Sequence, residues 1–277
     1  MKQNFVAQKI SRALIAILFS LTAICMVTVV SAQMKPKVKN IVIVHGAFAD
    51  ASGWEAVFNI LKARGYNVTA VQNPLSSLED DVAATKRILD KQDGPVVLVG
   101  HSWAGTVITQ AGEHPKVVSL VYVAAFMPKV GENTLDLVGW APASPENGIL
   151  PPDSAGWLYY DKAKFHAGFC ADVSAEKAEF MFASQAPIFA RSFGEPVTEC
   201  AWITRPSFGI VPMQDNSINP VIERAMYKRA GAKVTELPGN HVIFMSKPKQ
   251  VADVIEEAAM AGAGKNTTAM AGVLTSN

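Results

Sequence analysis

Cysteine is scarce in this chain of 277 residues, which has three cysteines and five histidines. No Cys and His residues occur at the spacing of metal ligands, so the sequence gives no indication of a metal site. After the N-terminal segment only Cys170 and Cys200 remain. In an oxidising compartment they could form a disulfide across about thirty residues, or stay as two isolated buried thiols. The sequence leaves both alternatives open.

The chain also lacks an excess of charge of either sign. Lysine and arginine number 25 against 24 acidic residues, for a net charge of +1, and no basic cluster follows the N-terminal segment. Binding to nucleic acid usually needs a concentrated positive patch. We therefore expect no nucleic-acid partner.

The N-terminal segment has the pattern of a targeting sequence. A basic start precedes the uninterrupted apolar stretch Ala13–Val30, and Val30-Ser31-Ala32 supplies the small residues of a signal-peptidase site. We predict a signal peptide over residues 1–32 and a periplasmic or secreted protein that does not contact the membrane once the leader is cleaved. Because the apolar stretch is just long enough to cross a bilayer, an uncleaved N-terminal anchor is the alternative.

Strand-like and helix-like segments alternate along most of the remaining chain. The sequence predicts strands at 41–44, 67–71, 95–99, 117–126, 208–213 and 233–237, and the apolar, β-branched runs at 41–44, 95–99 and 117–126 are expected to be buried. Amphipathic stretches predict helices at 54–64, 78–91, 106–112, 220–229 and 248–260. This alternation indicates an α/β fold, with a mostly parallel sheet flanked by helices, in one domain over residues 38–260. Residues 261–277 are small, polar and aperiodic, and we predict a disordered tail.

The alternation stops after Pro128 and resumes near Phe208. Residues 129–205 carry scattered prolines and glycines and many aromatic side chains, including Trp140, Trp157, Tyr159, Tyr160, Phe165, Phe169, Phe180, Phe182, Phe189 and Trp202. An insertion of this length inside a compact domain needs a structure of its own. We predict a mainly helical cap over a site, in which most aromatics pack against the core and a few contact a ligand.

The hexapeptide Gly100-His101-Ser102-Trp103-Ala104-Gly105 lies between a predicted strand and a predicted helix. A serine between small residues in this setting is typical of a nucleophile elbow, a tight turn that lifts the hydroxyl clear of the sheet. Ala104 stands where a second glycine is usual. A plain glycine- and serine-containing loop is the structural alternative, and partners elsewhere in the chain distinguish the two.

Two such partners follow predicted strands. Asp215 comes directly after the strand at 208–213, and His241 comes after the strand at 233–237. Because the carboxyl ends of parallel strands share one edge of a sheet, we expect both side chains to meet Ser102 there. A serine hydroxyl needs a histidine to remove its proton, and the imidazole needs a carboxylate to orient it. The sequence therefore predicts a catalytic triad of Ser102, His241 and Asp215.

Other titratable residues have weaker positions. For the acid, the alternative is Glu132 or Asp136, which follow the strand at 117–126. We expect His101 to point away from the nucleophile and His45 to order the first loop through hydrogen bonds. The histidines that compete for the role of base are His45, His101, His114 and His166.

Acyl transfer also needs backbone N–H donors for the oxyanion of the tetrahedral intermediate. One donor is expected from the Trp103 amide, directly after the nucleophile. The other is expected from the loop after the first strand, where we choose the Ala47 amide, with Phe48 as second choice. We also expect the Trp103 side chain to pack under the cap.

Five segments together resemble the α/β-hydrolase superfamily: Val44–Phe48, Gly53-Trp54, Gly100–Gly105, Gln214-Asp215-Asn216 and Gly239-Asn240-His241. Its members place nucleophile, acid and histidine in this order along the chain. Within it, residues 38–259 resemble the cap-bearing branch of plant methylesterases, hydroxynitrile lyases and their bacterial relatives. The lyases of that branch carry a lysine beside the catalytic histidine and a threonine in the first loop. Val242 and a loop without threonine stand at those places here, which speaks against cyanohydrin cleavage.

The resemblance implies a cofactor-free serine esterase that cleaves small-molecule carboxylic esters through an acyl-enzyme. A lyase or a cofactor-free perhydrolase on the same triad is the alternative within the fold. A ligand receptor that keeps the triad without using it is the alternative from another class of protein.

Overall fold

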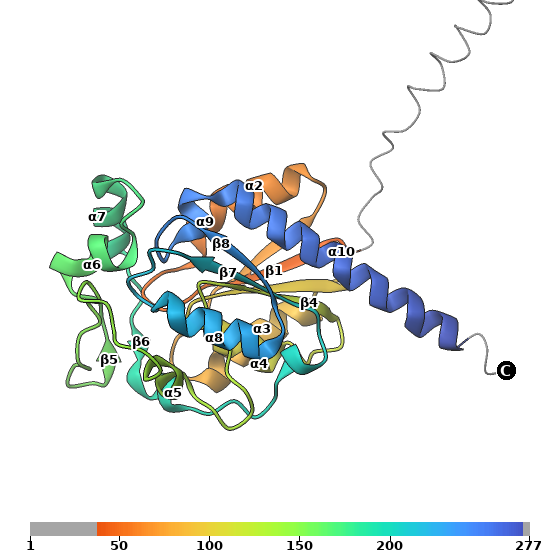
Figure 1. Ribbon diagram of the computed structural model, residues 1–277, viewed down its shortest axis with the longest axis horizontal. Helices are drawn as coiled ribbons and strands as arrows, with labels where there is room; N and C mark the ends of the chain where they lie inside the picture. Colours follow the sequence, from red (N-terminus) through yellow and green to blue (C-terminus); the bar gives the residue numbers. More distant parts are fainter. Residues whose placement is uncertain (1–37, 274–277) are drawn as a thin grey trace, which may run out of the picture. The chain divides into compact units, whose positions relative to one another are not determined.

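A six-stranded parallel sheet lies at the centre of the structure, a computed structural model that describes residues 38–273 (Figure 1). The strand order is β2-β1-β3-β4-β7-β8. The bounds are β1 Asn40–Val44, β2 Asn67–Val71, β3 Val96–His101, β4 Val117–Val123, β7 Ser207–Pro212 and β8 Lys233–Leu237. Each agrees with a predicted strand to within a few residues. The predicted signal peptide 1–32 lies outside the described residues, and none of the helices within them is long and apolar enough to span a membrane.

The strands are aligned at their carboxyl ends. Val44 at the end of β1 pairs with Gly100 of β3, and His101 pairs with Val123 of β4. On the other side of the sheet, Pro212 of β7 pairs with Leu237 of β8. The loops that follow β1, β3, β7 and β8 therefore leave the sheet at one edge, where open α/β sheets bind their ligands.

Helices cover both faces of this sheet (Figure 1). On one face lie α2 (Glu55–Ala63), α9 (Ile243–Ser246) and α10 (Pro248–Val273), and on the other lie α3 (Leu78–Asp90), α4 (Ala104–Ala111) and α8 (Pro220–Ala230). The chain passes from β1 outward to β2 and then returns to β3 on the other side of β1. Because crossovers between parallel strands are right-handed, this reversal places α2 and α3 on opposite faces. The predicted α/β fold is confirmed.

The burial of the strands follows their place in the sheet. Every residue of β1, β3 and β7 is buried, whereas the edge strands β2 and β8 expose most of theirs. Helices on both faces remove the inner strands from water, which is why their sequences are continuous apolar runs rather than alternating ones.

The insertion at 129–205 forms the cap. It contains the helices α5 (Thr134–Val138), α6 (Lys162–Phe169) and α7 (Ala175–Ala183) and the short 3-10 helices η2 (Ala190–Gly194) and η3 (Ala201–Ile203). It also contains an antiparallel pair of two-residue strands, β5 (Trp157–Leu158) and β6 (Ile188–Phe189). Long irregular stretches connect these elements, so the predicted helical cap has less regular structure than expected. Strands of two residues are too short to leave a periodic signal in the sequence.

The last helix is longer than predicted. We expected it to end near Met260 and a disordered tail to begin at 261, but α10 continues to Val273. Gly262 explains how the helix stays on the sheet, because a Cβ there would lie 2.7 Å from Val118 Cγ2 and would hold the helix away from β4. Alanine, the best helix former, recurs through this stretch and no proline interrupts it.

The two cysteines of the described chain are both free and buried. Cys170 Sγ lies 3.7 Å from the Phe165 carbonyl oxygen, and Cys200 Sγ lies 3.7 Å from that of Pro128. Of the two alternatives for this pair, the structure has isolated thiols. Burial raises the pKa of Cys170 to about 12 and that of Cys200 to about 11, which keeps both thiols protonated.

Candidate active site

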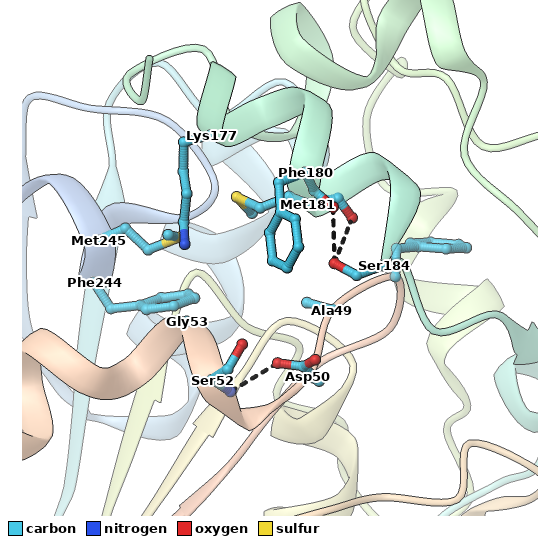
Figure 2. A pocket seen from close by; sticks show the side chains of 11 residues that line it. Ala49, Asp50, Ser52, Gly53, Lys177, Phe180, Met181, Ser184, Phe244 and Met245 are labelled. Atoms are coloured by element: carbon cyan, nitrogen blue, oxygen red, sulfur yellow. Dashed lines mark hydrogen bonds between the residues drawn. The ribbon is translucent and has the colours of Figure 1, made fainter. Parts of the chain in front are cut away.

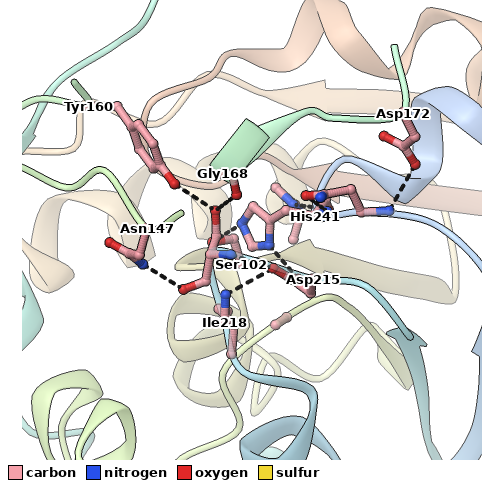
Figure 3. Close-up of polar contacts among 12 residues, drawn as sticks. Ser102, Asn147, Tyr160, Gly168, Asp172, Asp215, Ile218 and His241 are labelled. Atoms are coloured by element: carbon pink, nitrogen blue, oxygen red, sulfur yellow. Dashed lines mark hydrogen bonds and ion pairs between the residues drawn. The ribbon is translucent and has the colours of Figure 1, made fainter. Parts of the chain in front are cut away.

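Three predicted residues form a hydrogen-bonded chain at the carboxyl edge of the sheet (Figure 3). Ser102 Oγ lies 2.9 Å from His241 Nε2, and His241 Nδ1 lies 2.7 Å from Asp215 Oδ2. They come from the loops after β3, β8 and β7. Ser102 is 9% exposed and the other two are more deeply buried. The N–H at Nδ1 donates to the carboxylate, so Nε2 is free to accept the serine proton.

The backbone around Ser102 is a strained turn. Ser102 has a φ of 53°, in the left-handed region that favours glycine. A Cβ at Gly100 would lie 2.7 Å from the Ala104 carbonyl oxygen, and one at Gly105 would lie 2.0 Å from the Phe126 carbonyl oxygen. The turn therefore needs glycine at positions 100 and 105. Ala104 fits in the turn. The second glycine that is usual at position 104 is therefore needed here at position 105.

The Asp215 carboxylate is also bound through its second oxygen, Oδ1. Its Oδ1 accepts hydrogen bonds from the amides of Ser217 at 2.7 Å and Ile218 at 2.9 Å. These two bonds orient the carboxylate so that Oδ2 faces the imidazole.

The two predicted oxyanion donors lie in two loops that are close together. Within residues 38–273, the amides of Ala47 and Trp103 donate to no other group of the chain and are free to bind a substrate oxygen. A Cβ at Gly46 would lie 2.8 Å from Ser102 Cβ, so glycine lets the first loop approach the elbow. The second choice, Phe48, is wrong: its amide donates to the Ala186 carbonyl at 2.9 Å. Its φ of 60° turns this N–H toward the cap.

The competing histidines all have other partners. His45 Nδ1 lies 2.8 Å from the Gly46 carbonyl and His45 Nε2 accepts from the Asn73 amide at 2.9 Å, so it orders the first loop as predicted. His101 Nε2 lies 3.1 Å from the His241 carbonyl, and burial lowers the pKa of His101 well below its usual range. His114 pairs with Asp90, and His166 Nε2 lies 3.0 Å from the Val173 carbonyl.

The alternative acids are engaged elsewhere. Glu132 forms an ion pair with Arg229 at 2.7 Å, and the Arg229 guanidinium helps to lower the pKa of that carboxyl against the effect of burial. Asp136 caps the N-terminus of α5 together with Asn133. Neither contacts a histidine among the described residues, so Asp215 is the acid that the structure brings to His241.

An acid that the sequence did not indicate lies behind the elbow. Trp103 Nε1 donates to Asp81 Oδ2 at 2.7 Å, and Asp81 Oδ1 accepts from the Leu75 amide at 2.8 Å. Burial raises the pKa of Asp81 to about 6. The Trp103 ring also packs 5.4 Å from that of Phe193 in the cap, as predicted. Asp81 lies in the first turn of α3, a place where acids are common, so its position in the sequence does not indicate this contact.

A second unpredicted acid lies near Asp215. Glu223 on α8 has no exposed surface, and neither carboxyl oxygen has a hydrogen-bond partner among the described residues. Burial and the adjacent Asp215 charge raise the pKa of Glu223 well above its usual range. We infer that Glu223 is a neutral acid at neutral pH, because an ionised one would be buried beside a like charge.

A pocket opens between the cap and the core next to the first loop (Figure 2). One wall comes from α7, with Lys177, Phe180 and Met181, and the facing wall comes from α9, with Phe244 and Met245. The loop after β1 forms the floor, and Phe48 belongs to it. The walls are largely apolar, with single charges at Lys177 and Asp50. Across residues 38–273, no three His, Cys, Asp or Glu side chains gather as a metal site would require.

Comparison with known proteins identifies the family. The family model described as "Alpha/beta hydrolase family" matches residues 41–254. The chain belongs to the alpha/beta hydrolase family. This membership identifies it as a hydrolase and confirms the resemblance seen in the sequence.

Relatives in this family include the pyrethroid hydrolase of Sphingobium wenxiniae, 28% identical over 261 residues, with 84% of this chain and 91% of that protein covered. Methylesterase 7 of Arabidopsis thaliana is 33% identical over 108 residues, 33% of this chain and 42% of that protein. Among solved structures, a pyrethroid hydrolase from Sphingobium faniae superposes with a TM-score of 0.69 at 24% identity, covering 82% of this chain and all of that one. This last likeness shows the fold alone.

The two glycine positions of the elbow lead to a matched pair of variants. Gly105→Ala should lower the free energy of unfolding by about 1–3 kcal/mol or more, because its Cβ would overlap the Phe126 carbonyl oxygen. Ala104→Gly should cost about 1 kcal/mol or less, the usual loss in helix propensity. Urea unfolding followed by circular dichroism measures both. Equal stability of Gly105→Ala and the unaltered protein would contradict the close contact.

The neutral state of Glu223 leads to a pH-dependent prediction. A folded-state pKa above the unfolded value means that Glu223 contributes stability at low pH and loses it as the pH rises above 4.5, the ordinary value. Glu223→Gln keeps the shape but cannot ionise, so its stability relative to the unaltered protein should increase from pH 5 to pH 8. Urea unfolding at several pH values tests this. The exposed Glu179→Gln serves as control, and a difference that stays constant or shrinks as the pH rises would show that the pKa of Glu223 is not raised in the folded protein.

Proposed function

We propose that the protein is a carboxylic ester hydrolase that uses Ser102, His241 and Asp215 as a catalytic triad. The observation that carries this proposal is the continuous hydrogen-bonded chain from Ser102 Oγ through the imidazole to Asp215 Oδ2. It is supported by a strained turn that presents the serine and by two unengaged amides on either side of it. Each part has the role that acyl transfer through a serine requires.

In the first half-reaction, Ser102 Oγ attacks the ester carbonyl carbon while its proton passes to His241 Nε2. The carbonyl oxygen becomes an oxyanion, which accepts hydrogen bonds from the Ala47 and Trp103 amides. The tetrahedral intermediate collapses when its bond to the alkoxy oxygen breaks, and the imidazolium protonates that oxygen to release the alcohol. Asp215 stabilises the imidazolium and keeps Nδ1 protonated throughout.

In the second half-reaction, water attacks the acyl-enzyme. His241 Nε2 takes a proton from the water, a second oxyanion forms, and the bond to Ser102 Oγ breaks. The serine recovers its proton from the imidazolium and the carboxylic acid leaves. Since His241 must be neutral at the start of each half-reaction, the rate should fall at acid pH.

The substrate we propose is an ester with a sizeable apolar or aromatic group. The pocket beside the first loop is walled by Phe180, Met181 and Phe244, which can take such a group, and it reaches Phe48, the residue after the oxyanion donor Ala47. The relative from Sphingobium wenxiniae is a pyrethroid hydrolase, which supports a small-molecule substrate. Activity should therefore be higher on p-nitrophenyl esters with longer or aromatic acyl groups than on the acetate.

Ser102→Ala should abolish ester hydrolysis, with a loss on the order of 10⁴- to 10⁶-fold, because no other group in the triad can form the acyl-enzyme. Hydrolysis of p-nitrophenyl esters measures this, with the exposed Ser154→Ala as control. A fluorophosphonate probe, which reacts with activated serines, should label the unaltered protein at Ser102 and leave Ser102→Ala unlabelled.

The same two measurements separate the alternatives. Labelling of Ser102 without hydrolysis of any ester would favour a lyase or perhydrolase on the same triad, to be tested with cyanohydrins and with hydrogen peroxide. The absence of labelling in the folded protein would favour a ligand receptor. Either result would overturn the proposed ester hydrolysis.

We also propose that the protein is exported and cleaved after Ala32. The proposal rests on the basic start, the apolar stretch Ala13–Val30 and the small residues before Gln33. N-terminal sequencing of the protein recovered from the periplasm or the medium should begin at Gln33. A full-length chain in the membrane fraction would instead indicate an N-terminal anchor.

A further inference from the structure

One short part of the cap contacts both loops that carry the acid and the base. This part is the end of α6 and the turn after it, residues 167–172. The carbonyl of Ala167 accepts from Asn216 Nδ2 at 3.0 Å, and that of Gly168 accepts from Ser217 Oγ at 2.9 Å. Asn216 and Ser217 directly follow Asp215, so residues 167–172 hold the acid loop.

Asp172 holds the histidine loop in the same way. Its Oδ2 accepts from the Asn240 amide at 2.9 Å and from Ser246 Oγ at 2.5 Å (Figure 3). Asn240 in turn accepts the His241 amide proton through its own Oδ1, at 2.7 Å. A continuous series of hydrogen bonds therefore runs from a cap carboxylate to the backbone of the proposed general base.

The contact is close because a glycine allows it. Gly239 has a φ of 155°, and a Cβ there would lie 2.9 Å from Asp172 Oδ2 and 2.3 Å from Ile243 Cδ1. Any other residue at this position would push the carboxylate away from the Asn240 amide. On the other side of the imidazole, the Phe169 ring packs edge-to-face with that of His241 at 5.2 Å between centroids.

The burial of the Asp172 carboxylate at this position lowers the stability of the folded state. Its Oδ1 is buried and has no hydrogen-bond partner among residues 38–273. A buried acceptor without a partner destabilises the folded state. The two bonds at Oδ2 have to compensate for Oδ1: one comes from the loop that carries the histidine and the other from Ser246 at the end of α9, the helix that follows this loop.

We infer that Asp172 is a positioning residue for His241, and that residues 167–172 tie the alignment of Ser102, His241 and Asp215 to the position of the cap. This inference rests on the proposed function. The imidazole must present Nε2 to the serine and Nδ1 to the carboxylate at the same time, and small displacements of such a group cost much rate. When Asp172 no longer binds the loop, substrate can still enter the pocket but meets a misaligned base.

The test is Asp172→Ala assayed by steady-state ester hydrolysis. We expect kcat to fall about 10- to 100-fold while KM changes by about threefold or less, because alignment is lost and the pocket on α7 and α9 is intact. Asp172→Asn keeps an acceptor oxygen for the Asn240 amide and should recover most of the lost kcat. Ser246→Ala removes one of the two bonds and should give a smaller fall than Asp172→Ala.

Asp161→Ala is the matched control. Asp161 caps the other end of the same helix, where its carboxylate accepts from the amides of Ala163 and Lys164 and from no group of the histidine loop. It should weaken the cap helix and leave kcat near that of the unaltered protein. Urea unfolding of every variant verifies that it is folded at the assay temperature.

The rate of fluorophosphonate labelling at Ser102 separates the two proposals. A slower labelling rate in Asp172→Ala, recovered in Asp172→Asn, would support the positioning role even if no ester is hydrolysed. An unchanged kcat and labelling rate in folded Asp172→Ala would overturn it. So would a loss of kcat in Asp161→Ala as large as in Asp172→Ala, since that would show a general weakening of the cap.

Discussion

The left-handed backbone at Ser102 is the constraint on which the rest of the site depends. The Ser102 amide donates to the carbonyls of Val123 and Ala124 at the end of β4, and the Phe126 and Gly105 amides donate to its carbonyl. These four bonds hold a conformation that a serine would not adopt by itself. The Ser102 side chain points from the turn toward the loop after β8, and its Oγ lies 2.9 Å from His241 Nε2. If the turn at Ser102 relaxed, the serine hydroxyl would no longer lie near both the imidazole and the two amides.

Buried carboxyl groups surround this turn and differ in what they do. Asp215 receives two amides on one oxygen and faces the imidazole with the other. Asp81 anchors the Trp103 indole from below, and Glu223 stays neutral in the interior near Asp215. Burial raises the pKa of Asp81 to about 6 and that of Glu223 well above its usual range, and of these two carboxyls Asp81 alone receives N–H donors that offset the effect of burial.

The cap takes part in the site as well as covering it. The Ala186 carbonyl accepts a hydrogen bond from the Phe48 amide, and Phe193 packs on Trp103. Residues 167–172 bind the loops that carry Asp215 and His241. A cap tied to the core at so many places lines the pocket beside α7 and also orders the groups beneath it. Under the proposed function, selection of substrate and alignment of the triad would therefore both depend on the cap.

Local patterns in the sequence determined the strands, the elbow and the order of Ser102, Asp215 and His241, and they led to the prediction of the Ala47 and Trp103 donors, because each depends on a few neighbouring residues at the end of a predicted strand. Only the tertiary structure decided the rest. Asp81 and Asp172 meet partners far away in the sequence, and the fold buries Glu223 near Asp215. The requirement for glycine at 105 rather than 104 comes from the Phe126 carbonyl, in the segment that follows β4. The hydrogen bond of the Phe48 amide likewise depends on a distant residue, because its acceptor is the carbonyl of Ala186. Hydrogen bonds and steric contacts between distant segments leave no periodic trace along the chain, so they appear only once it has folded.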